Sequence, residues 1–277
     1  MDKKEALKIV KNDSRKLKNL PDHFKKDKEF ISKIVKQNGY ALEYAHKSLR
    51  KDKKIVLEAV KQTGFALKFA NESLKKDREI VLAAVKQEDF NSDDNPLQFA
   101  DKNLRKDKEI VLAAIKYNSY AIYYADESLK LDKDLVLEAV KNDGILLDYL
   151  IDKRFRMDRD VALAAVKSWH GALDIVDESF RKDREFVLAA VIIDGLKILK
   201  VDKSFLKDRE VVIEALKQVA EEEIRIKKEN DADPLMTSQD KENASNFYPV
   251  RSFFDLLNLD EDLKKDPKIL KIVGLLN

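Results

Sequence analysis

The fold is decided by the stretch Asp52-Lys53-Lys54-Ile55-Val56-Leu57-Glu58-Ala59-Val60-Lys61, because variants of it recur along the chain. An aspartate anchors each copy, and successive anchors lie 25 or 26 residues apart, except for one spacing of 30 and one of 58. The anchors are Asp2, Asp27, Asp52, Asp77, Asp107, Asp132, Asp158, Asp183, Asp208 and Asp266. Such a period is typical of repeat architectures, in which each copy is stable only when it packs on its neighbours.

Each copy is expected to form a long helix that begins at the anchor and ends near a lysine nine residues later. The anchor suits a helix N-cap, since its carboxylate can accept hydrogen bonds from free backbone N–H groups. Apolar residues three, four, five, seven and eight positions after the anchor span an arc of about 200°, so neighbours should cover the helix on two sides. The lysines suit the negative helix C-terminus; they are Lys11, Lys36, Lys61, Lys86, Lys116, Lys141, Lys167 and Lys217.

The rest of each copy is expected to hold a short second helix, as in 40–45, and then a tight 3₁₀ turn. An Asp or Asn six residues before the next anchor caps that turn. Glycines between the two helices predict left-handed C-caps; they are Gly39, Gly64, Gly144 and Gly195. The chain is therefore predicted to be a single all-α solenoid over residues 1–277, elongated and, by analogy with other α-solenoids, right-handed, with about ten helix–turn–helix copies and no strand. A flexible polar insertion is expected at 219–247, before the last copy.

Two segments carry a resemblance to a known family: Asp107–Lys116 and Tyr124–Lys130. They resemble the repeat catalogued as domain of unknown function 4116, and the resemblance covers nearly the whole chain except about 219–247. Such repeats occur in bacterial and protist proteins, including those of bacteria that live inside other cells. The resemblance implies the helical-repeat fold and adds the hypothesis of a host-directed bacterial protein, but it transfers no functional residue.

Composition narrows the class of protein. Charged residues make up 38% of the chain, yet the net charge is only +2, which favours a surface of mixed sign over a nucleic-acid or membrane binder. There is no cysteine, so disulfides and thiolate metal sites are excluded. Neither a signal peptide nor a membrane span is recognisable, and a cytoplasmic protein, or one delivered into a host cell, is expected.

A cation follows nearly every anchor, although a positive charge at a helix N-terminus opposes the helix dipole. We expect each cation to pair with an anchor Asp, or with the Asp six residues before an anchor, in an adjacent copy, forming a partly buried ladder. The alternative is a row of anion-binding sites. The cations are Lys3, Lys28, Lys53, Arg78, Lys108, Lys133, Arg159, Arg184 and Arg209.

Aromatic residues follow the short helices of the first half, and we predict a partner-binding surface there. The candidates are Tyr40, Tyr44, Phe65, Phe69, Phe99, Tyr120, Tyr123 and Tyr124. The same positions of the second half hold Leu146, Tyr149, Gly171, Ile175, Leu196 and Lys200. Aromatics at helical spacing can also be core, but repeat packing alone should treat both halves alike. Trp169 is a further candidate, with filling a gap beside Gly171 as the alternative.

Neither catalysis nor a metal is expected. The histidines, His23, His46 and His170, lie in separate copies, and the chain has no Gly-rich phosphate loop or HExxH motif. Residues 89–95 alternate Asp and Asn like the first ligands of a calcium loop, but the sixth position is Asp94 and the twelfth is Ala100, so the glycine and the bidentate Glu are missing.

The leading hypothesis is therefore a non-catalytic protein-interaction scaffold without a cofactor, whose protein partner the sequence does not identify. Two alternatives stay open. One is a solenoid that binds nucleic acid or another polyanion through the lysines. The other is an enzyme with an unrecognised pocket.

Overall fold

The computed structural model describes residues 1–11, 13–87, 95–149, 151–169, 171–232 and 249–274. Their regular structure is helical, and none of these residues lies in a strand. The prediction of an all-α repeat fold is confirmed. Contacts group the chain into unit 1, Met1–Asp152, and unit 2, Lys153–Asn277, each of which is described by itself.

Unit 1 alternates long α-helices with short helices, most of them 3₁₀ helices labelled η. Its long helices are α1 (Lys3–Lys11), α3 (Lys28–Val35), α4 (Lys53–Gln62), α5 (Arg78–Val85), α6 (Lys108–Tyr117) and α7 (Lys133–Asn142). The short helices that follow them are η1 (Ser14–Asn19), η2 (Gly39–Tyr44), η4 (Gly64–Phe69), η5 (Pro96–Phe99), η7 (Ser119–Tyr124) and α8 (Leu146–Tyr149). The turns that lead into the next long helix include α2 (Asp22–Lys26), η3 (Leu49–Lys51) and η6 (Leu104–Lys106).

Unit 2 repeats this order. Its long helices are α9 (Arg159–Ser168), α10 (Arg184–Ile193), α11 (Arg209–Ala232) and α15 (Pro267–Ile272). The short helices after the first three are η9 (Ala172–Asp174), η11 (Gly195–Lys200) and α13 (Val250–Leu257). The turns are η8 (Lys153–Arg156), η10 (Glu178–Lys182), η12 (Lys203–Lys207) and α14 (Glu261–Lys264).

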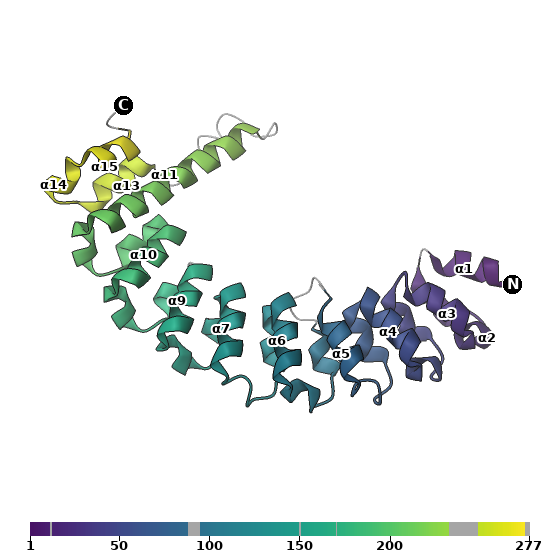
Figure 1. Cartoon of the computed structure of the whole chain (residues 1–277). Coiled ribbons are helices and arrows are strands. Elements are labelled where there is room, and N and C mark those ends of the chain that lie inside the picture. Colours follow the sequence, from purple (N-terminus) through teal and green to yellow (C-terminus); the bar gives the residue numbers. More distant parts are fainter. Residues whose placement is uncertain (12, 88–94, 150, 170, 233–248, 275–277) are drawn as a thin grey trace. The chain divides into compact units, whose positions relative to one another are not determined.

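The copies stack long helix on long helix and short helix on short helix. In unit 1, α3 contacts α4, α4 contacts α5, and α5 contacts α6, while η2 contacts η4 and η4 contacts η5 (Figure 1). The core side chains of α4 stand at the predicted apolar positions: Ile55, Val56, Ala59 and Val60 are all buried. Leu57, which lies five residues after the anchor and was also expected in the core, is only partly buried, so the covered arc is narrower than expected.

The anchors cap the long helices as predicted. Asp52 Oδ1 accepts hydrogen bonds from the backbone N–H groups of Lys54 and Ile55, at 3.1 and 3.2 Å. The residues six before an anchor cap the following turn, as where Asp177 accepts from the Ser179 N–H at 3.0 Å. Both caps satisfy N–H groups that a helix end leaves free.

The prediction of left-handed caps at Gly39, Gly64, Gly144 and Gly195 is wrong, since Gly274 is the one described glycine with a positive φ. Gly39 instead begins η2, directly after Asn38, which caps that helix by accepting from the Tyr40 N–H at 3.0 Å. The reason for glycine is space: a Cβ at Gly39 would lie 2.4 Å from the Ala59 carbonyl oxygen in the next copy. Gly195 stands equally close to Ala215 in α11.

The predicted ladder of cations is present, although its side chains are more exposed than expected. Arg184 Nε, for example, lies 2.7 Å from Asp208 Oδ2. The eight cations paired in this way keep 43–56% of their side-chain surface exposed. The pairs are Lys3–Asp27, Lys28–Asp52, Lys53–Asp77, Arg78–Asp107, Lys108–Asp132, Arg159–Asp183, Arg184–Asp208 and Arg209–Asp266.

Many ladder cations also bind a second carboxylate, two residues after the receiving anchor. Lys53 Nζ lies 2.8 Å from both Asp77 and Glu79. The hydrogen bond from Arg184 is the largest cause that lowers the pKa of Asp208. At Asp52, burial raises the pKa, but hydrogen bonds from Lys28 and the Ile55 N–H outweigh it, so the pKa lies below its usual value. At Asp52 and Asp208 the ladder thus favours the charged form of the carboxylate.

Helix α11 differs from the prediction, which placed a helix end near Lys217 and a polar insertion from 219. The helix continues to Ala232. Ion pairs one turn apart support the extension, as between Glu222 and Arg225 and between Glu223 and Lys227. Residues 233–247 of the predicted insertion lie outside the described residues.

Candidate partner-binding surface

The eight aromatic candidates of the first half, called the aromatic row from here on, lie on the short helices of unit 1. None of the eight is fully buried. Tyr40 is 42% and Tyr123 is 57% exposed, and the other six are partly buried: Tyr44, Phe65, Phe69, Phe99, Tyr120 and Tyr124. The rings therefore pack against the unit while part of each reaches solvent.

Ring contacts join the row from copy to copy. The centroids of Tyr40 and Phe65 lie 6.0 Å apart, and those of Phe65 and Phe99 lie 4.8 Å apart with the rings edge to face. These contacts link η2, η4 and η5. Tyr123 and Tyr124 meet edge to face within η7, at 5.1 Å. Edge-to-face pairs are a favoured aromatic arrangement, so the row is a packed surface rather than a set of separate rings.

Tyr149 extends the row, although the sequence analysis counted it with the second half. Its hydroxyl lies 2.5 Å from the Tyr120 hydroxyl, its ring centroid lies 6.4 Å from that of Tyr120, and it is 53% exposed. The signal in the sequence was its position in the repeat: Tyr149 lies 17 residues after its anchor Asp132, as Tyr124 does after Asp107.

Two lysines approach the ring faces. Lys68 Nζ lies 5.4 Å from the centroid of Phe65, 5.9 Å from that of Phe69 and 6.0 Å from that of Phe99. Lys130 Nζ lies 5.3 Å from the centroid of Tyr123. An ammonium group over a ring face is attracted by the ring quadrupole, so cations already occupy part of these faces.

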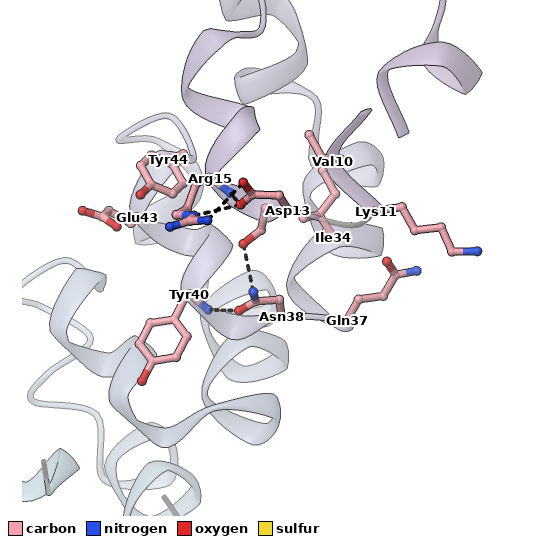
Figure 2. Close-up of a pocket in the computed structure, with 11 residues that line it drawn as sticks. Val10, Lys11, Asp13, Arg15, Ile34, Gln37, Asn38, Tyr40, Glu43 and Tyr44 are labelled. Carbon is pink, nitrogen blue, oxygen red and sulfur yellow. Dashed lines mark hydrogen bonds and ion pairs between the residues drawn. The ribbon is translucent and has the colours of Figure 1, made fainter. Parts of the chain in front are cut away.

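A pocket of about 680 Å³ opens between the first two copies of unit 1 (Figure 2). It contains two candidates, Tyr40 and Tyr44, which lie on the opposite side of it from Lys11 and Gln37 in Figure 2. The other lining residues are Val10, Asp13, Ser14, Arg15, Ile34, Asn38 and Glu43. In these copies a lysine at the end of a long helix and aromatics of a short helix line the same pocket. The edge at which the long helices end and the short helices follow is called the loop edge here.

Polar contacts inside this pocket are satisfied locally. Arg15 Nε lies 2.9 Å from Asp13 Oδ1, and this hydrogen bond is the largest cause that lowers the pKa of Asp13. A hydrogen bond with Glu43 raises the pKa of the Tyr44 hydroxyl. Ser14 Oγ accepts from the Asn38 side-chain amide at 2.9 Å. A serine held by an amide, rather than by a base, has no activation for nucleophilic attack.

Unit 2 has a pocket at the same place in the repeat. It measures about 440 Å³ and is lined by Ser168, Ile193, Asp194, Gly195, Leu196, Gln218, Val219, Glu222 and Arg225. Asp194 occupies the repeat position of Asn38, and Leu196 occupies that of Tyr40. The loop edge is therefore hollowed in both units.

Sequence reasoning missed exposed aliphatic residues on the loop edge of unit 2. Ile192, Ile193 and Leu199 are 49%, 45% and 50% exposed. Ile192 stands where other copies have the terminal lysine, and Leu199 stands at the position of Glu43. A break in the repeat pattern at polar positions was the available signal.

The lysines at the ends of the long helices of unit 1 are exposed and are called the lysine column: Lys11, Lys36, Lys61, Lys86, Lys116 and Lys141. Lys36 pairs with Glu58 at 3.3 Å. Among the described residues, the other five make no ion pair. Five exposed cations of the loop edge are thus not paired with any described carboxylate.

Trp169 is partly buried over Gly171: a Cβ on that glycine would lie 2.2 Å from the indole Cζ2. The contact fits the alternative stated from the sequence, that Trp169 fills a gap beside Gly171. Asn95, from the calcium-like stretch, is buried and caps η5 by accepting from the Leu97 N–H at 2.9 Å. The rest of that stretch, 88–94, lies outside the described residues.

Histidine and metal chemistry find little support in the described part of the chain. His46 Nδ1 lies 2.8 Å from Ser48 Oγ, while the His23 ring packs against Phe24 at 4.1 Å. His170 is not among the described residues. Within the described ranges, no three His, Asp or Glu side chains are grouped to hold a metal ion. Nor does any described helix have the length and apolar composition needed to cross a bilayer.

Comparison with known proteins agrees with the repeat architecture. The family described as "Domain of unknown function (DUF4116)" matches residues 2–50, 52–105, 90–130, 132–181, 158–200 and 183–220. These matches follow the anchored copies through most of the chain. No curated protein and no solved structure matches it.

Proposed function

Since the chain belongs to the DUF4116 repeat family, whose description names no activity, we propose its function from its surfaces: it is a non-catalytic scaffold that binds a protein partner on the loop edge of unit 1. Stacked repeats present such extended surfaces, and their loops are commonly used for binding.

The exposure of Tyr123 carries the proposal. Tyr123 is 57% exposed, at a position where other copies have Glu43, Lys68 and Gln98. A tyrosine there has no packing requirement to meet. Tyr117 and Tyr149, also of unit 1, are 46% and 53% exposed. Tyrosine is enriched at protein interfaces because it buries a large ring and keeps a hydroxyl for hydrogen bonding.

A catalytic role has less support from the same surface. The unit 1 pocket pairs its acid Asp13 with Arg15 at 2.9 Å and its hydroxyl Ser14 with an amide. Those contacts fix polar groups rather than leave them poised for proton transfer. The enzyme alternative needs an acid or base that is free to exchange a proton with a substrate, whereas Asp13 of this pocket is bound by Arg15.

The test is a quantitative affinity capture with a matched pair of variants. The double variant Tyr120→Ala, Tyr123→Ala removes two rings of the row. The control Leu131→Ala removes an apolar side chain of unit 1 that is 46% exposed and directly precedes the anchor Asp132. A partner should be retained by the wild type and by Leu131→Ala and lost by the double variant, with an affinity cost of at least about 2 kcal/mol once purified.

Lysates of the native cell and of a candidate host separate the two possible sources of the partner, which is how the host-directed hypothesis is decided. A partner that the double variant binds as tightly as the wild type would move the interface away from the aromatic row.

A further inference from the structure

We infer that the partner segment is an acidic peptide, extended along the copies of unit 1, with carboxylates against the lysine column and apolar side chains against the aromatic row. This inference rests on the proposed function and specifies the chemistry of its partner.

The first argument is the contrast between the two ends of each copy. At the anchor end, the ladder cations are held by carboxylates, as Lys53 is held by Asp77 and Glu79 at 2.8 Å. At the loop edge, Lys61, Lys116 and Lys141 are exposed and make no ion pair with the described residues. Among the described residues, the ladder cations are therefore paired with the unit's own acids, whereas these three lysines are available to the acids of a partner.

The helix dipoles do not remove this imbalance. A helix C-terminus is equivalent to roughly half a negative charge. A lysine without an ion-pair partner at that end therefore leaves a net positive charge of about half a unit per copy. Two carboxylates near this edge are already engaged: Glu58 binds Lys36 at 3.3 Å, and Asp13 binds Arg15 at 2.9 Å. Complementary charge speeds association and sets specificity at such a surface.

The second argument separates a peptide from a nucleic acid, which lysines and aromatics could also bind. Binding of single strands relies on bases stacked on open ring faces. Here the Lys68 ammonium lies within 6.0 Å of three ring centroids, and Phe65 and Phe99 meet edge to face. The Tyr123 face carries Lys130 at 5.3 Å. Cations and ring edges thus approach the faces of Phe65, Phe99 and Tyr123, which disfavours base stacking there and favours a peptide.

The repeat sets the spacing of the carboxylates. Packed helices lie about 8–10 Å apart, and an extended chain in the polyproline II conformation rises about 3.1 Å per residue with three residues per turn, so every third side chain points the same way. One copy therefore corresponds to about three peptide residues. The matching segment has an acidic residue at every third position, with Leu or Tyr between, over four copies from Lys61 to Lys141.

The experiment uses the full chain and fluorescent probes: a 12-residue peptide of this pattern, a peptide of the same composition with its acids grouped at one end, and a thymidine 12-mer. Affinities are measured by anisotropy at low and moderate salt. The triple variant Lys61→Gln, Lys116→Gln, Lys141→Gln is compared with Lys51→Gln, Lys76→Gln, Lys102→Gln, which removes equal charge from exposed lysines of unit 1 away from the lysine column.

The patterned peptide should bind the wild type more tightly than the grouped peptide. The column triple should weaken it by about tenfold, since three exposed pairs are lost, while the control triple should change it by less than about twofold. Equal loss in both triples, or equal binding of both peptides, overturns the inference. Tighter, column-dependent binding of the thymidine 12-mer also overturns it and assigns the edge to nucleic acid. If no peptide binds but a captured partner still depends on Tyr120 and Tyr123, the scaffold stands and only the acidic chemistry fails.

Discussion

The two carboxylate oxygens of Asp52 make different contacts, and substitutions can separate the contribution of each contact to stability. Its Oδ1 caps α4 by accepting from the N–H groups of Lys54 and Ile55, while Oδ2 lies 2.5 Å from Lys28 Nζ of the preceding copy. Asp52→Ala removes both, whereas Asp52→Asn keeps the capping oxygen and removes the charge.

The magnitudes follow from the surroundings of each oxygen. Loss of an N-cap costs about 1 kcal/mol, within a range of about 0.5–2. Lys28 is 56% exposed, so its pair with Asp52 is a surface pair worth under about 1 kcal/mol. Asp52→Ala should therefore lower the free energy of unfolding by about 1–2 kcal/mol, and Asp52→Asn by less than about 1.

Urea unfolding followed by far-ultraviolet circular dichroism measures both costs, and a double-mutant cycle with Lys28→Gln isolates the pair. The coupling between Asp52→Asn and Lys28→Gln should shrink in 0.5 M salt, because exposed pairs are screened. If Asp52→Asn proves as costly as Asp52→Ala, the charge pair dominates and the assignment of the cap as the larger contribution is refuted.

Three more predictions follow from the same stacking. Gly39→Ala should destabilise by about 1–3 kcal/mol in urea unfolding, because its Cβ would meet the Ala59 carbonyl oxygen at 2.4 Å; a change under about 0.5 would show that the copies can separate at no cost. Leu67→Ala should cost about 2–5 kcal/mol in the same assay, because Leu67 is 0% exposed in the core, and a smaller loss would mean that η4 collapses into the cavity. Asp52 and Asp208 have lowered pKa values in the fold, so the unfolded chain binds more protons as the pH falls through about 4. Their stabilisation is therefore present above that pH and is lost below it, and urea midpoints at pH 6 and pH 3 should show the drop, with a smaller one for Asp208→Asn.

Features that depend on one copy were predictable from the sequence. The anchors, the caps and the apolar positions recur with a local helical period. The ladder joins neighbouring copies, but it too was predictable, because the cation after nearly every anchor is unfavourable within its own helix. Leu57 was assigned to the core because periodicity does not reveal how far the next copy extends across a helix face.

Features that depend on the next copy were predicted less well. The glycines suggested a backbone conformation, but the reason for Gly39 is the approach of α4 from the following copy. The second ladder carboxylate, as at Glu79, resembled an ordinary acidic residue of a first helical turn. On the candidate surface, the aromatic row came from the asymmetry between halves, while its extension to Tyr149 required the fold.

The ladder also has a direction. Each ladder pair given above runs from a cation of one copy to the anchor of the following copy, so an inner copy such as that of Asp208 both accepts a link and donates one. The copy anchored at Asp266 accepts from Arg209 at 2.6 Å, but Pro267 replaces its cation, so it can receive a link and cannot pass one on. An inner copy could therefore be duplicated, or exchanged for another inner copy, without the loss of an ion pair between copies. If the Asp266 copy were moved to an inner position, the series of ion pairs between copies would be interrupted there, because no cation follows its anchor.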